Sequence, residues 1–173
     1  MERVLITGGI KSGKSSYVLK RTSFFDKKLF IATAEPFDEG MRKRIKNHKK
    51  EREGLGYDLF EEPIEIYKII KEKSHKYDVV VIDCITVWLN NLFFYKKNIE
   101  VELENLIYAL ENVNSNIFVI TNEVGSGIIS VKKNIRDYID SLGMINAKMA
   151  SICEEVVLMC CGLPVKIKGG KNT

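Results

Sequence analysis

The residues with the clearest chemistry are residues 8–15, GGIKSGKS, which contain the spacing Gly-x-x-x-x-Gly-Lys-Ser. An apolar strand-like run precedes them and a helical pattern follows, the context in which this spacing forms a phosphate-binding loop. The loop amides and the N-terminal end of the helix would face phosphate oxygens. Lys14 would reach the β- and γ-phosphates, and Ser15 would ligate Mg²⁺. A glycine turn before a surface helix is the alternative, but such a turn has no need for Lys14 and Ser15.

Asp83 is the second candidate for the same site. It ends the apolar run 79–82, VVVI, and a buried strand that ends in an acid can deliver one carboxylate to Mg²⁺ beside a phosphate loop. Many strands of α/β proteins end in an Asp that only caps the following turn or helix. The phosphate loop earlier in the chain favours the metal or nucleotide role for Asp83.

His48 lies in the basic stretch 42–52, RKRIKNHKKER, which holds seven Lys or Arg in eleven positions. On a helix Met41, Ile45 and His48 share a face, and Arg44 and Arg52 flank His48 at four-residue spacing. A neutral imidazole near a triphosphate bound by those arginines is a competent nucleophile at phosphorus. The alternative is a solvated histidine on a basic helix.

A third polar segment, residues 121–127 (TNEVGSG), follows another apolar strand and ends in two glycines. In open α/β sheets, ligands bind at the carboxyl ends of the strands, where polar side chains orient them. Asn122 and Glu123 are therefore candidates for contact with a substrate. The formation of a turn, with no ligand involved, is the alternative.

Alternating strand and helix signals surround these residues and predict a doubly wound α/β fold with a mostly parallel sheet, a phosphate-loop NTPase of three layers. Most strand signals are continuous apolar runs, typical of strands buried on both faces. We expect strands at 3–7, 28–33, 78–84, 117–121 and 156–160, a last edge strand at 163–168, and a loop with one short strand at 54–63. We expect helices at 14–25, 38–53, 64–74, 100–113 and 131–152, the last one broken near Gly143.

The composition is that of a soluble globular protein: 173 residues, 45% hydrophobic and 29% charged, with a net charge of +4. We expect one nucleotide-binding domain over 1–168 and a polar, glycine-rich flexible tail over 169–173. The chain begins directly with a strand pattern, and no apolar run approaches the roughly 18 residues of a membrane span, so a cytoplasmic protein is expected. His75, in a polar stretch, is expected on the surface.

The four cysteines show no paired metal-ligand spacing. Cys160 and Cys161 lie in an apolar, strand-like run, so all four cysteines are expected to be reduced core thiols in a reducing compartment. The basic stretch 42–52 suits a polyanion, either a nucleotide triphosphate or a nucleic acid.

Several stretches taken together resemble the bifunctional adenosylcobinamide kinase / adenosylcobinamide-phosphate guanylyltransferase family of cobalamin synthesis. These stretches occur in the same order as in the family, and together they span nearly the whole chain. The matching segments are TGGIKSGKS (7–15), FIATAE (30–35), the M-x-x-R-I-x-x-H helix (41–48) with Arg52, EEP (61–63), DCITVWLNNL (83–92), TNEVGSGI (121–128), Gly143-x-x-Asn146 and GLPVKIK (162–168). Trp88 and Leu89 within them are expected to pack in the core.

The resemblance implies two reactions on one substrate. A nucleoside triphosphate, ATP or GTP, phosphorylates the aminopropanol hydroxyl of adenosylcobinamide, and GTP then donates GMP to that phosphate. The histidine aligned with His48 carries GMP covalently, Mg²⁺ assists, and the family forms homotrimers. The residues that match the family's nucleotide site are Gly8, Gly9, Ile10, Lys11, Ser12, Gly13, Lys14, Ser15, Ala32, Thr33, Ala34, Lys49, Lys50, Glu51, Arg52, Glu61 and Asp83, with Glu62 as the alternative to Glu61.

The sequence departs from the family pattern at several positions. Two departures, Ile139 in place of Arg and Ala147 in place of Gln, fall on the expected substrate side, where Arg136 could stand in for the missing arginine. The others are Ile10-Lys11 for Ala-Arg, Tyr57 for Trp and Ser130 for Pro. These departures leave an alternative function, a small-molecule kinase that has lost nucleotidyl transfer. A nucleic-acid-binding ATPase is the less favoured third reading, since no set of stacking aromatics accompanies the basic helix.

Overall fold

The computed structural model describes residues 1–127 and 130–169, and within them seven strands form one sheet in the order β3-β2-β4-β5-β1-β6-β7. Every pairing is parallel except the last, in which β7 runs antiparallel to β6. The predicted fold class is therefore confirmed. The strands are β1 (Arg3–Gly8), β2 (Lys28–Ala32), β3 (Tyr57–Glu61), β4 (Val79–Asp83), β5 (Asn116–Ile120), β6 (Glu155–Cys160) and β7 (Leu163–Lys168).

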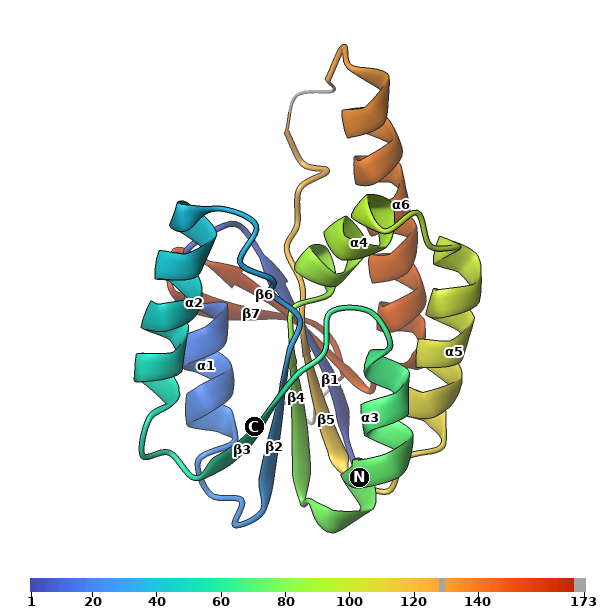
Figure 1. Ribbon diagram of the computed structural model, residues 1–173. Helices are drawn as coiled ribbons and strands as arrows, with labels where there is room; N and C mark the ends of the chain where they lie inside the picture. Colours follow the sequence, from blue (N-terminus) through green and yellow to red (C-terminus); the bar gives the residue numbers. More distant parts are fainter. Residues whose placement is uncertain (128–129, 170–173) are drawn as a thin grey trace.

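Helices cover both faces of this sheet, with α1 and α2 on one side and α3 to α6 on the other (Figure 1). The continuous apolar runs have a direct explanation in this arrangement. In β4, Val79 and Val81 pack into the core under α1, and Val80 and Ile82 pack into the core under the other helices. The helices are α1 (Lys14–Arg21), α2 (Glu39–Arg52), α3 (Ile66–Lys73), a 3₁₀ turn η1 (Ser74–Lys76), α4 (Ile85–Phe94), α5 (Ile99–Glu111) and α6 (Lys133–Ile152).

The fold differs from the sequence prediction at α4, to which no helix was assigned. Six of its ten residues are buried, among them Trp88 and Leu89, which pack in the core as expected. A helix that is apolar around most of its circumference shows no 3.6-residue period in the sequence. The helix predicted over 14–25 also ends earlier, at Arg21.

The predicted break near Gly143 is wrong, because α6 runs without interruption from Lys133 to Ile152. Glycine weakens a helix by about 1 kcal/mol relative to alanine. Leu142, Ile145 and Met149 are fully buried on one face of α6 and anchor the helix on both sides of Gly143. This packing outweighs the weak propensity of one glycine.

The prediction of core thiols is wrong for two of the four cysteines. Cys153 is buried and Cys84 is half-buried, but Cys160 and Cys161 are both exposed. They lie at the turn from β6 to β7, at the side of the sheet where β7 is exposed along its whole length. The apolar run is mostly buried in β6, but Cys160 is the exposed last residue of that strand and Cys161 belongs to the turn that follows. All four cysteines are free thiols, as expected.

The remaining expectations concern the short and edge strands, one surface histidine and the C-terminal tail. β7 is the predicted edge strand, β3 is the short strand expected within 54–63, and His75 is exposed. Ile128 and residues 170–173 of the expected tail lie outside the described residues. No helix in the described part of the chain is long and apolar enough to cross a membrane.

Trp88 offers a test of the packing of α4. Its indole N–H donates a hydrogen bond of 2.7 Å to the carbonyl of Ile64, and its side chain is fully buried. Trp88→Phe leaves that carbonyl without a partner, so we expect the free energy of unfolding to fall by about 1–3 kcal/mol. Urea titration followed by circular dichroism measures this loss. Tyr108→Phe, at a side chain that is 60% exposed, is the control, with a change below about 0.5 kcal/mol. Equal stability of the two variants would contradict the assignment.

Candidate active site

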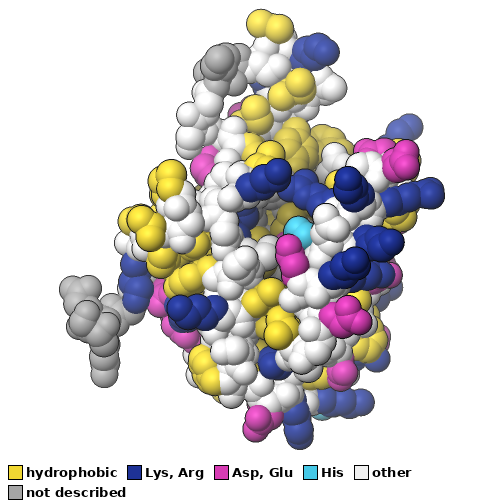
Figure 2. Space-filling view, turned by 90° about the vertical axis from the view of Figure 1, so that its left-hand side faces the viewer, with side chains coloured by type: hydrophobic (Ala, Val, Ile, Leu, Met, Phe, Trp, Pro, Cys, Tyr) yellow, Lys and Arg dark blue, Asp and Glu magenta, His cyan; other side chains and the backbone are white. Residues whose placement is uncertain are grey.

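One pocket lies at the carboxyl ends of β1, β2, β4 and β5, between the phosphate loop (residues 8–15) and α2. It has a cavity of about 420 Å³. In the space-filling view it is a hollow with a histidine at its edge and basic side chains around it (Figure 2). Its walls are formed by Ile10, Lys11, Ser12, Gly13, Lys14, Ser15, Ser16, Ala32, Ala34, Met41, Arg44, Ile45, Asn47, His48, Glu51, Arg52, Glu61, Asp83, Cys84, Val87, Ile120 and Asn122.

The phosphate loop is held in shape by its backbone. Gly8 has φ 142° and Gly13 has φ 93°, values that favour glycine, and Lys11 at φ 57° completes the turn. At Gly8, an added Cβ would lie 2.4 Å from the carbonyl oxygen of Met159 in β6. The loop therefore packs directly on the neighbouring strand, and only glycine fits at position 8.

Lys14 crosses the loop from inside. Its Nζ donates hydrogen bonds to the carbonyl oxygens of Gly8 at 2.9 Å and Gly9 at 2.6 Å. The side chain is buried, and this burial lowers the pKa of Lys14. An ammonium group held in this way stands ready to exchange loop carbonyls for phosphate oxygens.

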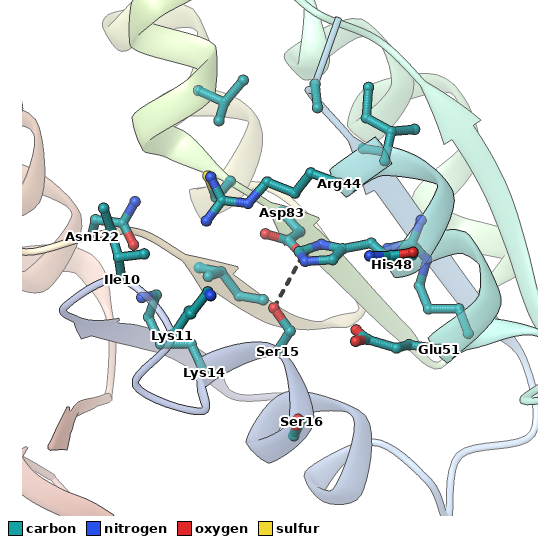
Figure 3. A pocket seen from close by; sticks show the side chains of 18 of the residues that line it. Ile10, Lys11, Lys14, Ser15, Ser16, Arg44, His48, Glu51, Asp83 and Asn122 are labelled. Carbon is teal, nitrogen blue, oxygen red and sulfur yellow. Dashed lines mark hydrogen bonds and ion pairs between the residues drawn. The ribbon is translucent and has the colours of Figure 1, made fainter. Parts of the chain in front are cut away.

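Asp83 lies at the centre of the pocket, where three elements meet (Figure 3). Its Oδ2 accepts a hydrogen bond from the hydroxyl of Ser15 at 3.4 Å and lies 4.0 Å from Nδ1 of His48. Burial raises the pKa of the Asp83 carboxyl, partly offset by the nearby His48, Arg52 and Lys14. Oxygen atoms of this kind suit Mg²⁺.

His48 is carried by α2, whose first turn is capped by the Asp38 carboxylate accepting from the backbone N–H of Met41. None of the residues of α2 is fully buried. The half-buried face consists of Met41, Ile45, His48 and Arg52, the face expected from helical spacing. The side chain of His48 is 36% exposed and points toward Asp83 (Figure 3).

Arg52 and Arg44 place positive charge on the same pocket wall. The Arg52 guanidinium lies 4.1 Å from the centre of the Phe30 ring, and burial lowers its pKa. A guanidinium packed on an aromatic ring is fixed in position for planar contact with phosphate oxygens. The pocket therefore combines loop amides, a lysine and two arginines around one carboxylate.

Two adjacent glutamates, Glu61 and Glu62, have different surroundings. Glu61 lines the pocket and forms an ion pair of 2.7 Å with Lys49. Glu62 instead accepts hydrogen bonds from the backbone N–H groups of Ile64 and Glu65, just before α3. The geometry favours Glu61 over Glu62 as the residue near a nucleotide.

Six of the residues predicted for the site do not line the pocket. Thr33 is fully buried, and its hydroxyl donates to the carbonyl oxygen of Cys84 and accepts from the Cys84 N–H, so it holds β2 to β4. Glu123 accepts a hydrogen bond from the N–H of Gly125 within its own loop. The other four are Gly8, Gly9, Lys49 and Lys50, of which the glycines hold Lys14.

The pocket also contains residues that the sequence analysis did not assign to it: Ser16, Asn47, Cys84, Val87 and Ile120. Ser16, Asn47 and Cys84 are each adjacent in the chain to a residue that was predicted for the site, and this adjacency could have indicated them. Burial raises the pKa of the Cys84 thiol to about 12, so this thiol stays protonated near neutral pH. Cys84 is therefore not a thiolate nucleophile near neutral pH.

On the side expected to face the substrate, Asn146 holds the loop that carries Asn122. Its Oδ1 accepts from the Thr121 hydroxyl at 2.8 Å, and its Nδ2 donates to the Asn122 carbonyl at 3.1 Å. Arg136 donates to the carbonyl oxygens of Ser130 and Val131 and does not line the pocket. The structure therefore does not place Arg136 as a replacement for the missing arginine.

The two departures from the family pattern on the expected substrate side, Ile139 and Ala147, do not line the pocket either. Ile139 is half-buried and close to Gly125, and Ala147 is exposed on α6. Neither residue changes the set of side chains around Asp83 and His48.

Comparison with known proteins gives the same family as the motifs. The family described as cobinamide kinase / cobinamide phosphate guanyltransferase matches residues 4–167. The bifunctional adenosylcobalamin biosynthesis protein CobP of Pseudomonas aeruginosa is 31% identical over 96% of this chain and 98% of its own. The corresponding protein CobU of Escherichia coli is 29% identical over 95% of this chain and 99% of its own.

Solved structures with low sequence identity share the fold. The flagellar accessory protein FlaH from Methanocaldococcus jannaschii has a TM-score of 0.57 at 14% identity, covering 98% of this chain and 79% of its own. The RadB recombinase has a TM-score of 0.52 at 16% identity, covering 91% of this chain and 73% of its own. These similarities concern the arrangement of the sheet and helices alone.

The two glycines at the start of the phosphate loop give a matched test of its geometry. Gly8→Ala forces a Cβ against the Met159 carbonyl, whereas a Cβ at Gly9 meets nothing within 4 Å. We expect Gly8→Ala to lower the free energy of unfolding by about 1–3 kcal/mol and to weaken GTP binding, with Gly9→Ala close to wild type. Thermal denaturation and isothermal titration with GTP measure both effects. Similar behaviour of the two variants would contradict the described loop.

Asp83→Asn tests whether stability is sacrificed for binding. Burial raises the pKa of Asp83 in the folded protein, so the ionised carboxylate is more stable in the unfolded chain. The resulting loss of folding stability grows as the pH rises above the ordinary Asp pKa of about 3.9. We expect Asp83→Asn to raise the Tm at pH 7, with the difference vanishing below about pH 4.

The same substitution should weaken Mg²⁺-dependent GTP binding about tenfold or more. Asp26→Asn, at an exposed position far from the pocket, serves as the control and should change neither quantity. A lower Tm for Asp83→Asn at pH 7 would show that attraction to the surrounding cations outweighs desolvation.

Proposed function

The chain belongs to the cobinamide kinase / cobinamide phosphate guanyltransferase family, and from this premise we propose that the pocket between the phosphate loop and α2 carries out both reactions. The protein is a bifunctional kinase and guanylyltransferase of adenosylcobalamin biosynthesis, as its relatives are named. ATP or GTP phosphorylates the aminopropanol hydroxyl of adenosylcobinamide, and GMP is then transferred from GTP to that phosphate. The observation that carries the proposal is the position of His48, 4.0 Å from the carboxylate that accepts a hydrogen bond from the phosphate loop.

The triphosphate would lie along the phosphate loop. The loop amides and the N-terminal end of α1 face it, and Lys14 turns from the carbonyl oxygens of Gly8 and Gly9 to the β- and γ-phosphates. Arg44 and Arg52 lie on the opposite wall and would contact the remaining phosphate charge. The pocket residues would therefore fix the chain of three phosphates from two sides.

Mg²⁺ fits the residues present. The Ser15 hydroxyl and the Asp83 carboxylate, 3.4 Å apart, would hold it together with phosphate oxygens of the substrate. When bound, it neutralises charge on the phosphates and on the departing group. No group of three or more His, Cys, Asp or Glu that could hold a metal occurs in the described ranges.

In the kinase reaction, the oxygen of the aminopropanol hydroxyl attacks the γ-phosphorus, and the bond to the nucleoside diphosphate breaks. The hydroxyl proton leaves to solvent. Lys14 stabilises the charge that develops between the β- and γ-phosphates. The residues of the pocket contribute positioning and electrostatic stabilisation, and no covalent bond to the protein forms in this step.

In the guanylyltransferase reaction, His48 would act as the nucleophile. Its Nδ1 faces Asp83, so Nε2 is the nitrogen available to attack the α-phosphorus of GTP. The phosphorus–oxygen bond to pyrophosphate breaks and a phosphoramidate forms. An oxygen of adenosylcobinamide phosphate then attacks the same phosphorus, the phosphorus–nitrogen bond breaks, and His48 regains its lone pair. Arg52 would stabilise the charge on the phosphate in both steps.

We also propose that either ATP or GTP serves in the kinase step, that Asn122 and Glu123 contact the substrate, and that the protein assembles into a homotrimer. The small size of the chain makes a site for a bulky corrinoid shared between subunits physically reasonable.

Incubation with GTP labelled at the α-phosphate tests the proposed role of His48. We expect protein-bound label that is lost in acid and retained in alkali, and His48→Ala should reduce it roughly 10³-fold or more. His75→Ala, an exposed histidine far from the pocket, should be labelled like the wild type.

The kinase reaction provides the second measurement on the same variants. Because no covalent bond to His48 forms there, we expect its kcat in His48→Ala to stay within a few-fold of the wild type. Kinase turnover in a wild-type protein that takes up no label would instead identify a kinase without nucleotidyl transfer.

A further inference from the structure

Three exposed aromatic side chains, Phe37, Phe94 and Tyr95, lie together beside the pocket and form what we call the aromatic patch. Their exposed fractions are 43%, 63% and 44%. The ring centres of Phe37 and Phe94 are 4.8 Å apart, and those of Phe94 and Tyr95 are 5.1 Å apart. A cluster of aromatic rings that remains open to water is typical of a binding surface.

The aromatic patch continues the pocket outward along α4. Val87 lines the pocket, and Phe94 follows it by seven residues, so the two side chains share one face of the helix about 10 Å apart. Between them Asn91 donates a hydrogen bond of 2.7 Å to the backbone of the segment that follows β2. On that segment Ala34 lines the pocket, and Phe37 lies against Phe94. The pocket and the patch are thus consecutive parts of one surface between two elements.

A polar group accompanies the rings. The hydroxyl of Tyr95 donates a hydrogen bond of 3.1 Å to Oε1 of Glu35. The other oxygen of this carboxylate, Oε2, is buried and has no hydrogen-bond partner among the described residues, so the apolar ring faces lie next to a carboxylate with an unused acceptor. This combination suits a ligand that has a flat, conjugated face and amide N–H groups at its edge.

We propose that the aromatic patch binds the corrin macrocycle of the acceptor while its aminopropanol arm reaches into the pocket. The inference rests on the proposed function. A cavity of about 420 Å³ is the size of a site for one small ligand, so a nucleotide and the aminopropanol arm leave no room in it for the macrocycle, which lies outside. Phe37 and Phe94 contact the conjugated ring, and the Glu35 carboxylate accepts from its amide side chains.

A second copy of this chain is the other occupant that an exposed aromatic surface could have. The observations favour the corrinoid, because α4 and the segment after β2 each contribute residues to both the pocket and the aromatic patch. A substrate whose reactive arm enters the pocket must place its bulk where the pocket opens. The test therefore measures both the corrinoid and the assembly state.

The experiment compares the KM for adenosylcobinamide among variants of the full-length protein. Phe94→Ala and Phe37→Ala remove one ring each, and Phe94→Tyr keeps the ring. Phe24→Ala is the matched control, since Phe24 is 74% exposed and contacts another ring, that of Phe25, beyond the C-terminal end of α1 and away from the pocket. The KM for ATP, the α-phosphate labelling by GTP and the molar mass by light scattering are measured in parallel.

We expect Phe94→Ala to raise the KM for adenosylcobinamide about tenfold, since removal of a stacking ring has an effect of this size. Phe37→Ala should raise it as well, with Phe94→Tyr and Phe24→Ala close to the wild type. The KM for ATP and the labelling by GTP should stay within about twofold in every variant, because the patch lies outside the nucleotide pocket.

Two results would overturn the inference. One is an unchanged KM for adenosylcobinamide in both Phe94→Ala and Phe37→Ala; the other is a changed molar mass with an unchanged KM, which would assign the patch to self-association. If the wild type phosphorylates no adenosylcobinamide, the proposed function fails. Equilibrium dialysis with adenosylcobinamide then still measures whether the patch binds the ring, so the two failures are distinguishable.

Discussion

The buried carboxylate of Asp83 is the point on which the site depends. Ser15 from the phosphate loop and His48 from α2 both face the same oxygen of this group, and β4 fixes its position at the carboxyl edge of the sheet. Keeping an ionised carboxylate in such a place costs free energy, which the surrounding cations offset only in part. A carboxylate that holds a metal ion and orients an imidazole would explain this loss of folding stability, since residues of binding sites are commonly less stable in the folded protein than function-free alternatives.

Much of this arrangement could be predicted from the sequence, because continuous apolar runs indicate buried parallel strands and the phosphate loop has a distinctive spacing. What failed depends on tertiary packing. The helix α4 shows no period because it is buried nearly all round, and α6 continues through Gly143 because buried residues on both sides hold it. For the site, helical spacing predicted the face of α2 that carries His48. The distance from His48 to Asp83 could not be predicted, since it depends on strand order and on the position of α2.

The attachment of α2 also bears on how one pocket could serve two reactions. None of the residues of this helix is fully buried, and it is held by the Lys49–Glu61 ion pair, by Arg52 on Phe30 and by the approach of His48 to Asp83. Exposed ion pairs contribute little to stability, so the Lys49–Glu61 pair adds little to this attachment. The phosphate loop, in contrast, is fixed by packing against β6. A phosphate loop fixed in this way, facing the proposed nucleophile on a helix without fully buried residues, suits a pocket in which first the γ-phosphorus and then the α-phosphorus reacts.

The claim that one pocket performs both reactions is tested most directly with the guanylylated protein itself. The protein is labelled with GTP, freed of nucleotide and assayed for ATP-dependent phosphorylation of adenosylcobinamide, before and after addition of pyrophosphate, which releases His48 by re-forming GTP. If the pocket is shared, the guanylyl group blocks ATP, so the kinase rate should fall in proportion to the labelled fraction and recover with pyrophosphate. A guanylylated protein that phosphorylates adenosylcobinamide at the full rate would contradict the account and require a second nucleotide site.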